Sequence, residues 1–146
     1  MTNADLKQIY YICKEIKLCE AELRELKHSS LTGSRIDGMP KSGRGDKVAD
    51  RAIRIADLEA KIERLQDKML DAQLEIWDFI DTIDDSMIRQ IIIYKHIKLM
   101  SWTKTAHKIG GGNTADSCRM AYKRFMRIKE GTNGGNSKAE TQISRI

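Results

Sequence analysis

The chain has 146 residues, enough for one domain or two very small ones. Hydrophobic residues make up 40%, charged residues 32% and aromatic residues only 5%, with one proline, which favours helices over a β-sandwich or barrel. No apolar run approaches the roughly 20 residues of a membrane-spanning helix, and the first residues lack the regions of a secretory signal. Three cysteines without a C-x-x-C spacing predict reduced thiols. We therefore expect a cytoplasmic protein that does not contact membranes.

The charge is distributed unevenly along the chain. Residues 1–85 contain 14 basic and 18 acidic side chains, a balance of −4. Residues 86–146 contain 12 basic and three acidic side chains, a balance of +9. Such an asymmetry between halves predicts a C-terminal part that binds a polyanion and an N-terminal part with a separate role.

Two long amphipathic helices are predicted in the N-terminal half. Helices are predicted over residues 3–28 and 47–81. In both, and on to Ile83 after the second, apolar side chains recur at alternating steps of three and four, the a/d spacing of a coiled coil. The apolar positions are Ile9, Ile12, Ile16, Cys19, Leu23 and Leu26, and then Ile55, Leu58, Ile62, Leu65, Met69, Ala72, Ile76, Phe79 and Ile83. Residues 1–83 are therefore expected to form an antiparallel coiled-coil helical hairpin.

Two segments without periodicity separate or follow the predicted helices. Residues 29–46 concentrate glycine, serine and the single proline, which predicts a mobile linker between the two hairpin helices. Residues 130–146 are rich in glycine and asparagine and predict a disordered tail.

Residues 84–129 carry the start and stop signals of three shorter helices. Asp84 or Asp85 can cap a helix that ends near residue 98. Ser101 can cap a helix of two turns, and Gly110 stands where a helix-terminating glycine belongs. Thr114 can cap a last helix that runs to about residue 129.

The last two of these helices have the pattern of a helix-turn-helix DNA-binding domain. Ala106 is small enough for the second helix to pack across the first, and Gly110 turns the chain four residues later. The second helix must bury one face and offer the other to the major groove. The expected buried face consists of Cys118, Ala121, Phe125 and Ile128, with Tyr122 beside them.

The exposed face supplies the candidate DNA contacts. Residues 86–129 hold ten basic side chains and a single acid, Asp116. Contacts to phosphates or guanine edges are expected from Arg119, Lys123, Arg124 and Arg127; further phosphate or base contacts from Asn113, Thr114, Asp116 and Ser117; and outlying phosphate contacts from Lys104 and Lys108. The histidines are scattered singly and no catalytic triad is discernible, so we expect no metal, no cofactor and no enzyme activity.

The stretch from Ile88 to Ile128, with Ser101-Trp102-x-x-Thr105-Ala106-x-x-Ile109-Gly110 inside it, resembles the region-four helix-turn-helix of bacterial sigma factors. More closely, the chain resembles small phage-encoded sigma-like regulators of the RinA/ArpU type. The resemblance covers residues 1–129. It implies a phage or prophage transcription regulator that binds promoter DNA and contacts bacterial RNA polymerase.

Our interpretation is thus an all-α, sequence-specific double-stranded DNA-binding transcriptional regulator, expected to be a homo-oligomer through the helical hairpin. Two alternatives remain open. One is a small terminase-like DNA-packaging subunit, which would form a ring of many copies. The other is a coiled-coil interaction module whose basic half binds an acidic protein. The mass in solution distinguishes the first alternative from a regulator, and affinity for DNA distinguishes the second.

Overall fold

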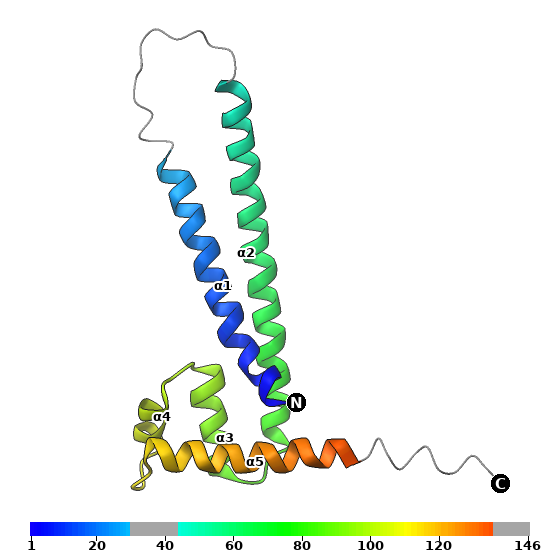
Figure 1. Ribbon diagram of the computed structural model, residues 1–146, viewed down its shortest axis with the longest axis vertical. Coiled ribbons are helices and arrows are strands. Elements are labelled where there is room, and N and C mark those ends of the chain that lie inside the picture. The colour runs from blue at the N-terminus through cyan, green and yellow to red at the C-terminus, as the bar shows by residue number, and fades with distance from the viewer. Residues whose placement is uncertain (30–43, 136–146) are drawn as a thin grey trace, which may run out of the picture. The chain divides into compact units, whose positions relative to one another are not determined.

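The computed structural model describes residues 1–29 and 44–135. In these ranges the chain is all-α, as the composition predicts, and has no strand. Its elements are α1 (Asn3–His28), α2 (Arg44–Asp81), α3 (Ser86–Ile92), the one-turn π-helix η1 (Ile93–Ile97), α4 (Trp102–Ile109) and α5 (Ala115–Gly135) (Figure 1). A search of the described helices finds none with the length and apolarity to cross a membrane.

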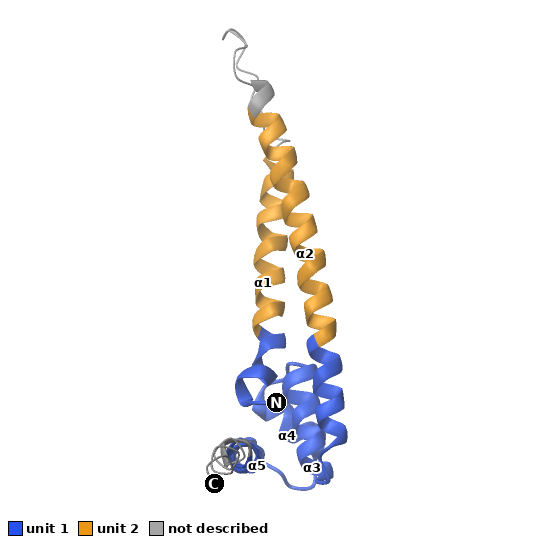
Figure 2. Ribbon diagram, turned by 90° about the vertical axis from the view of Figure 1, so that its right-hand side faces the viewer, with its two compact units in different colours: residues 1–10, 72–146 blue, residues 11–71 orange. Residues whose placement is uncertain are grey.

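Contacts divide the chain into two compact units (Figure 2). The first consists of residues 1–10 and 72–146, and the second of residues 11–71. Both α1 and α2 therefore contribute to both units. This division differs from the predicted boundary at residue 84, because the first residues of α1 and the last turns of α2 supply core side chains to the unit that contains α5.

In residues 11–71, α1 and α2 lie side by side in opposite directions (Figure 2). Glu15 pairs with Lys61 at 3.0 Å, and Glu22, further along α1, pairs with Arg54, which comes earlier in α2, at 2.7 Å. This order of the pairs shows that the two helices are antiparallel. Between the helices lies an apolar cluster in which the predicted a/d positions meet. Its buried members are Ile16, Cys19, Leu58 and Leu65, and Ile12, Leu23, Leu26, Ile62 and Met69 pack around them. The ion pairs are exposed, so burial of this seam supplies most of the stability of the unit.

The other unit has a separate core made from several elements. Leu6 and Ile9 come from the first turns of α1, Ile76 from α2, and Ile91 from α3; each is at most 1% exposed. In the same unit, α3, α4 and α5 pack on one another. The unit is therefore built from segments at both ends of the chain, because residues 1–10 belong to it as well.

The caps and turns follow the local signals. Asp85 is the N-cap of α3, and its carboxylate accepts hydrogen bonds from the backbone N–H groups of Met87 at 2.8 Å and Ile88 at 3.2 Å. The guanidinium of Arg89 donates to the Ile83 carbonyl at 2.8 Å and braces the turn before α3. Of the two aspartates predicted as this cap, Asp84 and Asp85, it is Asp85 that caps the helix.

Two predicted boundaries need correction. Helix α2 begins at Arg44, within the predicted linker, whereas residues 30–43 of that linker lie outside the described residues. Helix α5 continues to Gly135, so the prediction that the disordered tail begins at residue 130 is wrong; residues 136–146 lie outside the described part. The added turn is tied down at Glu130, whose carboxylate accepts a hydrogen bond from the Asn3 backbone N–H at 2.8 Å.

Candidate nucleic-acid interface

A glycine turn joins α4 to α5 and sets where α5 begins. The hydroxyl of Ser101 accepts a hydrogen bond from the Lys104 backbone N–H at 3.3 Å and caps α4. The helix is terminated by its C-cap Gly110, whose φ of 69° and ψ of −149° are accessible in practice only to glycine. The two following glycines also have positive φ. The Asn113 amide then donates to the Gly110 carbonyl at 2.8 Å, which closes the turn.

The start of α5 is held by a reciprocal cap. The Ser117 backbone N–H donates to the Thr114 hydroxyl at 3.1 Å, and the Thr114 backbone N–H donates to the Ser117 hydroxyl at 2.9 Å. Three of the candidate contact residues, Asn113, Thr114 and Ser117, therefore build the turn and the helix start. Thr114 and Ser117 remain exposed, whereas Asn113 is half-buried.

One face of α5 is anchored in the core by residues four apart. Cys118, Tyr122 and Met126 are at most 4% exposed. The Tyr122 hydroxyl donates to Asn3 Oδ1 at 2.7 Å, and burial raises the pKa of this phenol. The Tyr122 ring also lies against those of His96 and Trp102, with centroids 5.3 and 5.6 Å away.

The predicted buried face of α5 is wrong at one end. Ile128 is 64% exposed, and Ala121 and Phe125 are only half-buried. The reason is that the core contact follows the four-residue row through Tyr122 to Met126, which turns Ile128 outward. Ala106 is 4% exposed in α4, a helix that packs on both α3 and α5.

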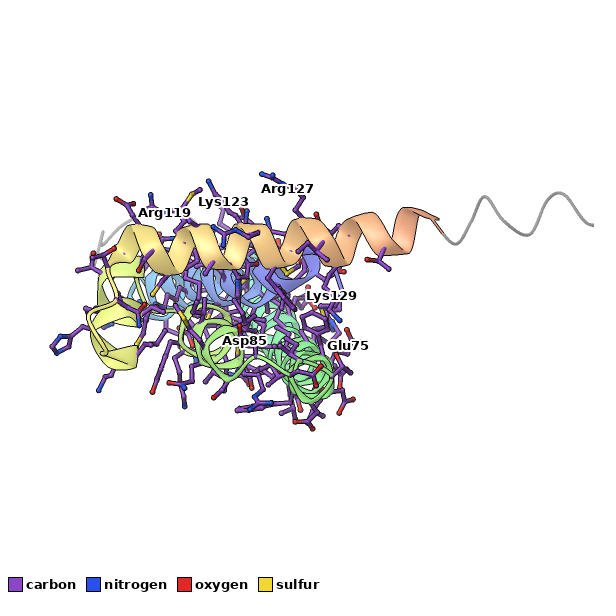
Figure 3. The ribbon with its side chains drawn as sticks, turned by 90° about the horizontal axis from the view of Figure 1, so that it is seen from below. Glu75, Asp85, Arg119, Lys123, Arg127 and Lys129 are labelled. Atoms are coloured by element: carbon purple, nitrogen blue, oxygen red, sulfur yellow. The ribbon has the colours of Figure 1, made fainter. Side chains whose placement is uncertain are left out.

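A row of basic side chains follows the outer side of α5. Arg119, Lys123 and Arg127 are four residues apart, which places successive side chains about 40° apart around the helix. They point away from the body of the unit, whereas the acidic Glu75 and Asp85 lie on the other side of α5 (Figure 3). Three positive charges thus line one side of α5, together with the acidic Asp116 near its start and Glu130 one turn beyond Arg127.

The remaining candidate contacts occupy the edges of this face. Asp116 has a side chain 84% exposed and pairs with Arg119 at 3.1 Å, which orients the guanidinium along the helix. Arg124 is exposed on α5. Lys104 and Lys108 are exposed on α4, one turn apart. Their spacing puts both ammonium groups on the same side of α4.

Two other basic residues pack against aromatic rings. The Lys95 ammonium donates to the Met100 carbonyl at 3.0 Å and lies 5.2 Å from the centre of the Trp102 ring. Burial, together with the positive charge of Arg119, lowers the pKa of Lys95. The Lys129 ammonium lies 5.8 Å from the centre of the Phe125 ring. The proximity of Lys95 and Arg119 adds to the positive potential at the start of α5.

Met120 is an exposed residue of α5 that the sequence pattern does not single out. This side chain is 56% exposed, although methionine is usually buried. Its exposure follows from the observed core row of α5, because Met120 lies about 160° around the helix axis from Tyr122. The observed core row, with Met126 buried in place of Ile128, places Met120 near the centre of the outer face.

Comparison of the chain with protein-family models, with curated proteins and with solved structures finds no match. The function is therefore inferred from the geometry of α4 and α5.

Proposed function

We propose that this chain is a helix-turn-helix protein that binds double-stranded DNA in the cytoplasm and controls transcription. In this proposal α4 and α5 form the helix-turn-helix, and α5 is the recognition helix that enters the major groove. The single observation that carries the proposal is the row of Arg119, Lys123 and Arg127 along an accessible side of a helix whose neighbouring row, Cys118, Tyr122 and Met126, is anchored in the core (Figure 3).

The surrounding residues support the same role. The glycine turn fixes the point at which α5 begins, and the exposed Lys104 and Lys108 of α4 extend the basic surface toward a flanking phosphate. Ten basic residues and one acid in residues 86–129 give this segment a balance of +9. Phosphate neutralisation by such a surface supplies sequence-independent affinity, and contacts to base edges supply specificity.

The resemblance to sigma region four and to phage regulators extends the proposal to promoter DNA and bacterial RNA polymerase. The two-helix unit would then form the dimerisation or higher-order contact as a coiled-coil hairpin. Large apolar side chains that are more than half exposed on α1 and α2 favour a homo-oligomer, because a second copy would cover them. They are Tyr11, Leu18, Val48, Ile53, Leu70 and Leu74. A two-fold dimer would present two copies of α5 about 34 Å apart, one turn of DNA.

The test is the affinity for a mixed-sequence duplex of about 30 base pairs between roughly 50 and 200 mM salt, in which each neutralised phosphate adds about −0.9 to the slope of log K against log salt. We expect the variant Arg119→Ala with Lys123→Ala to bind more weakly and to lose about 1.8 from the magnitude of that slope. The matched control is Arg64→Ala with Lys68→Ala, which removes the same charge from exposed positions of α2.

Equal losses in the two variants, with helicity intact in both, would show that net charge and not α5 determines binding, and the recognition-helix assignment would fail. Absence of binding at low salt would favour the protein-interaction module. A mass in solution of many subunits, measured by light scattering, would favour the terminase-like ring over a regulator.

A further inference from the structure

The outer face of α5 has an apolar residue at its centre. Met120 is 56% exposed and lies nearly opposite the buried Tyr122. Its neighbours one turn away on the helix surface are all polar or charged. They are Asp116, Ser117, Lys123 and Arg124. Met120 therefore has no apolar neighbour one turn away on its own helix, and its thioether side chain extends from the middle of a charged surface.

The position of Met120 along α5 is the one from which base edges are read. It is the sixth residue of the helix, in the second turn, and the N-terminal turns of a recognition helix are those that contact bases. Lys123 and Arg124 lie on either side of it, about 60° and 40° away around the helix axis, and would hold the phosphates on the two sides of the groove. An unbranched side chain with rotatable bonds then reaches the groove floor without steric conflict.

We propose that Met120 packs against the 5-methyl group of a thymine in the major groove and makes the protein prefer thymine at that position. The proposal rests on the proposed DNA-binding function of α5. Its chemical basis is that the thymine methyl is the one alkyl group on the major-groove edge of the four base pairs, where the cytosine C5 carries only a hydrogen atom and the remaining groups read by proteins are hydrogen-bond donors or acceptors. The thymine methyl is therefore the group in the major groove against which the apolar side chain of Met120 can pack.

Ile128 supplies the matched control. It is also exposed and apolar, at 64% of its surface, but it lies eight residues further along α5. This is about 12 Å beyond Met120 at the helical rise. A straight helix leaves the curved groove over such a distance, so Ile128 is not expected to contact a base.

The experiment begins with duplexes selected by the wild-type protein from a randomised synthetic pool. In the selected site each thymine is then replaced in turn by deoxyuridine, which lacks only the methyl group. We expect one thymine, or one in each half of a two-fold site, at which the replacement weakens wild-type binding about fourfold per methyl. Met120→Ala should bind the thymine duplex more weakly and respond to the replacement by less than about 1.5-fold, whereas Ile128→Ala should respond like the wild type.

The same methyl group is present on 5-methylcytosine, and synthetic duplexes that place either base at the sensitive position distinguish the two. Tighter binding of the 5-methylcytosine duplex would overturn the assignment to thymine. DNA binding without any deoxyuridine effect, or with the same effect in Met120→Ala, would overturn the role of Met120 and leave the proposed function intact. Failure to select or bind any DNA would overturn both.

Discussion

Acid should destabilise the unit that contains α5, because it buries an uncharged histidine. His96 is 5% exposed at the end of η1, with its ring against Tyr122. Burial lowers the pKa of His96 to about 4; a hydrogen bond with the Leu6 backbone opposes the shift, and the nearby charges of Lys95 and Lys7 add to it. Its Nε2 has no hydrogen-bond partner among the described residues, so a proton placed there would have none either.

The magnitude follows from linkage between protonation and folding. In the unfolded chain a histidine has a pKa near 6.5, so between about pH 6.5 and pH 4 the unfolded state binds a proton that the folded state does not. Stability therefore falls as the pH falls through this window. The full shift corresponds to about 3 kcal/mol, of which roughly 2 kcal/mol should be lost between pH 7 and pH 4.5.

The assay is the free energy of unfolding from urea titrations at a series of pH values, followed by tryptophan fluorescence. Both Trp77 and Trp102 belong to the unit that contains His96, so the signal reports its unfolding. In His96→Gln the loss between pH 7 and 4.5 should shrink by about 2 kcal/mol. Asp5, whose pKa is lowered by hydrogen bonds with Thr2, titrates in both proteins and cancels in the comparison.

The same dependence on pH in the variant and the wild type would refute this reasoning. A second readout avoids dependence on the variant: an NMR titration of His96 in the wild type should give a midpoint near 4. A midpoint near 6.5 would show that the ring is accessible to water.

Two further substitutions test the anchoring of α5. Gly110→Ala should lose about 1–3 kcal/mol in a urea titration because its φ of 69° and ψ of −149° suit only glycine, whereas Gly131→Ala, in a regular turn of α5 with open space around it, should gain about 0.5–1 kcal/mol; similar values for the two would contradict the described turn. Tyr122→Phe should lose about 1 kcal/mol with the hydrogen bond to Asn3, and an unchanged midpoint would show that this bond is not formed in solution.

The periodicity of the sequence predicted the long helices well, because residues at alternating steps of three and four share one face only if the chain is helical. Leu58, Leu65 and Ile76 are all buried in that frame. Caps could be predicted for the same reason, since a capping bond joins residues two or three apart. Asp85 and Ser101 illustrate this.

Periodicity does not reveal what a buried face packs against. Leu6 lies three residues before Ile9, the first of the predicted apolar positions, yet nothing in its neighbours indicates that it enters the core of the unit that contains α5. For the same reason, the sequence does not reveal that Met126 and not Ile128 is buried on α5. This choice of buried face depends on the hydrogen bond between Tyr122 and Asn3, residues 119 positions apart, and on the Asn3–Glu130 bond. The exposure of Met120 follows from those distant contacts.

The hydrogen bond between Asn3 and Glu130 joins residues 127 positions apart, and this separation sets an order for folding during synthesis. At about 5–20 residues per second, Leu6 and Ile9 leave the ribosome some 6–25 s before their last core partners are made. The pairing within residues 11–71 needs nothing that is translated later than residue 71. The two-helix unit can therefore form early, while the N-terminal turns stay apolar and uncovered until α5 emerges. The unit that carries the proposed DNA-binding face is then the last part of the nascent chain to become protected from aggregation and proteolysis.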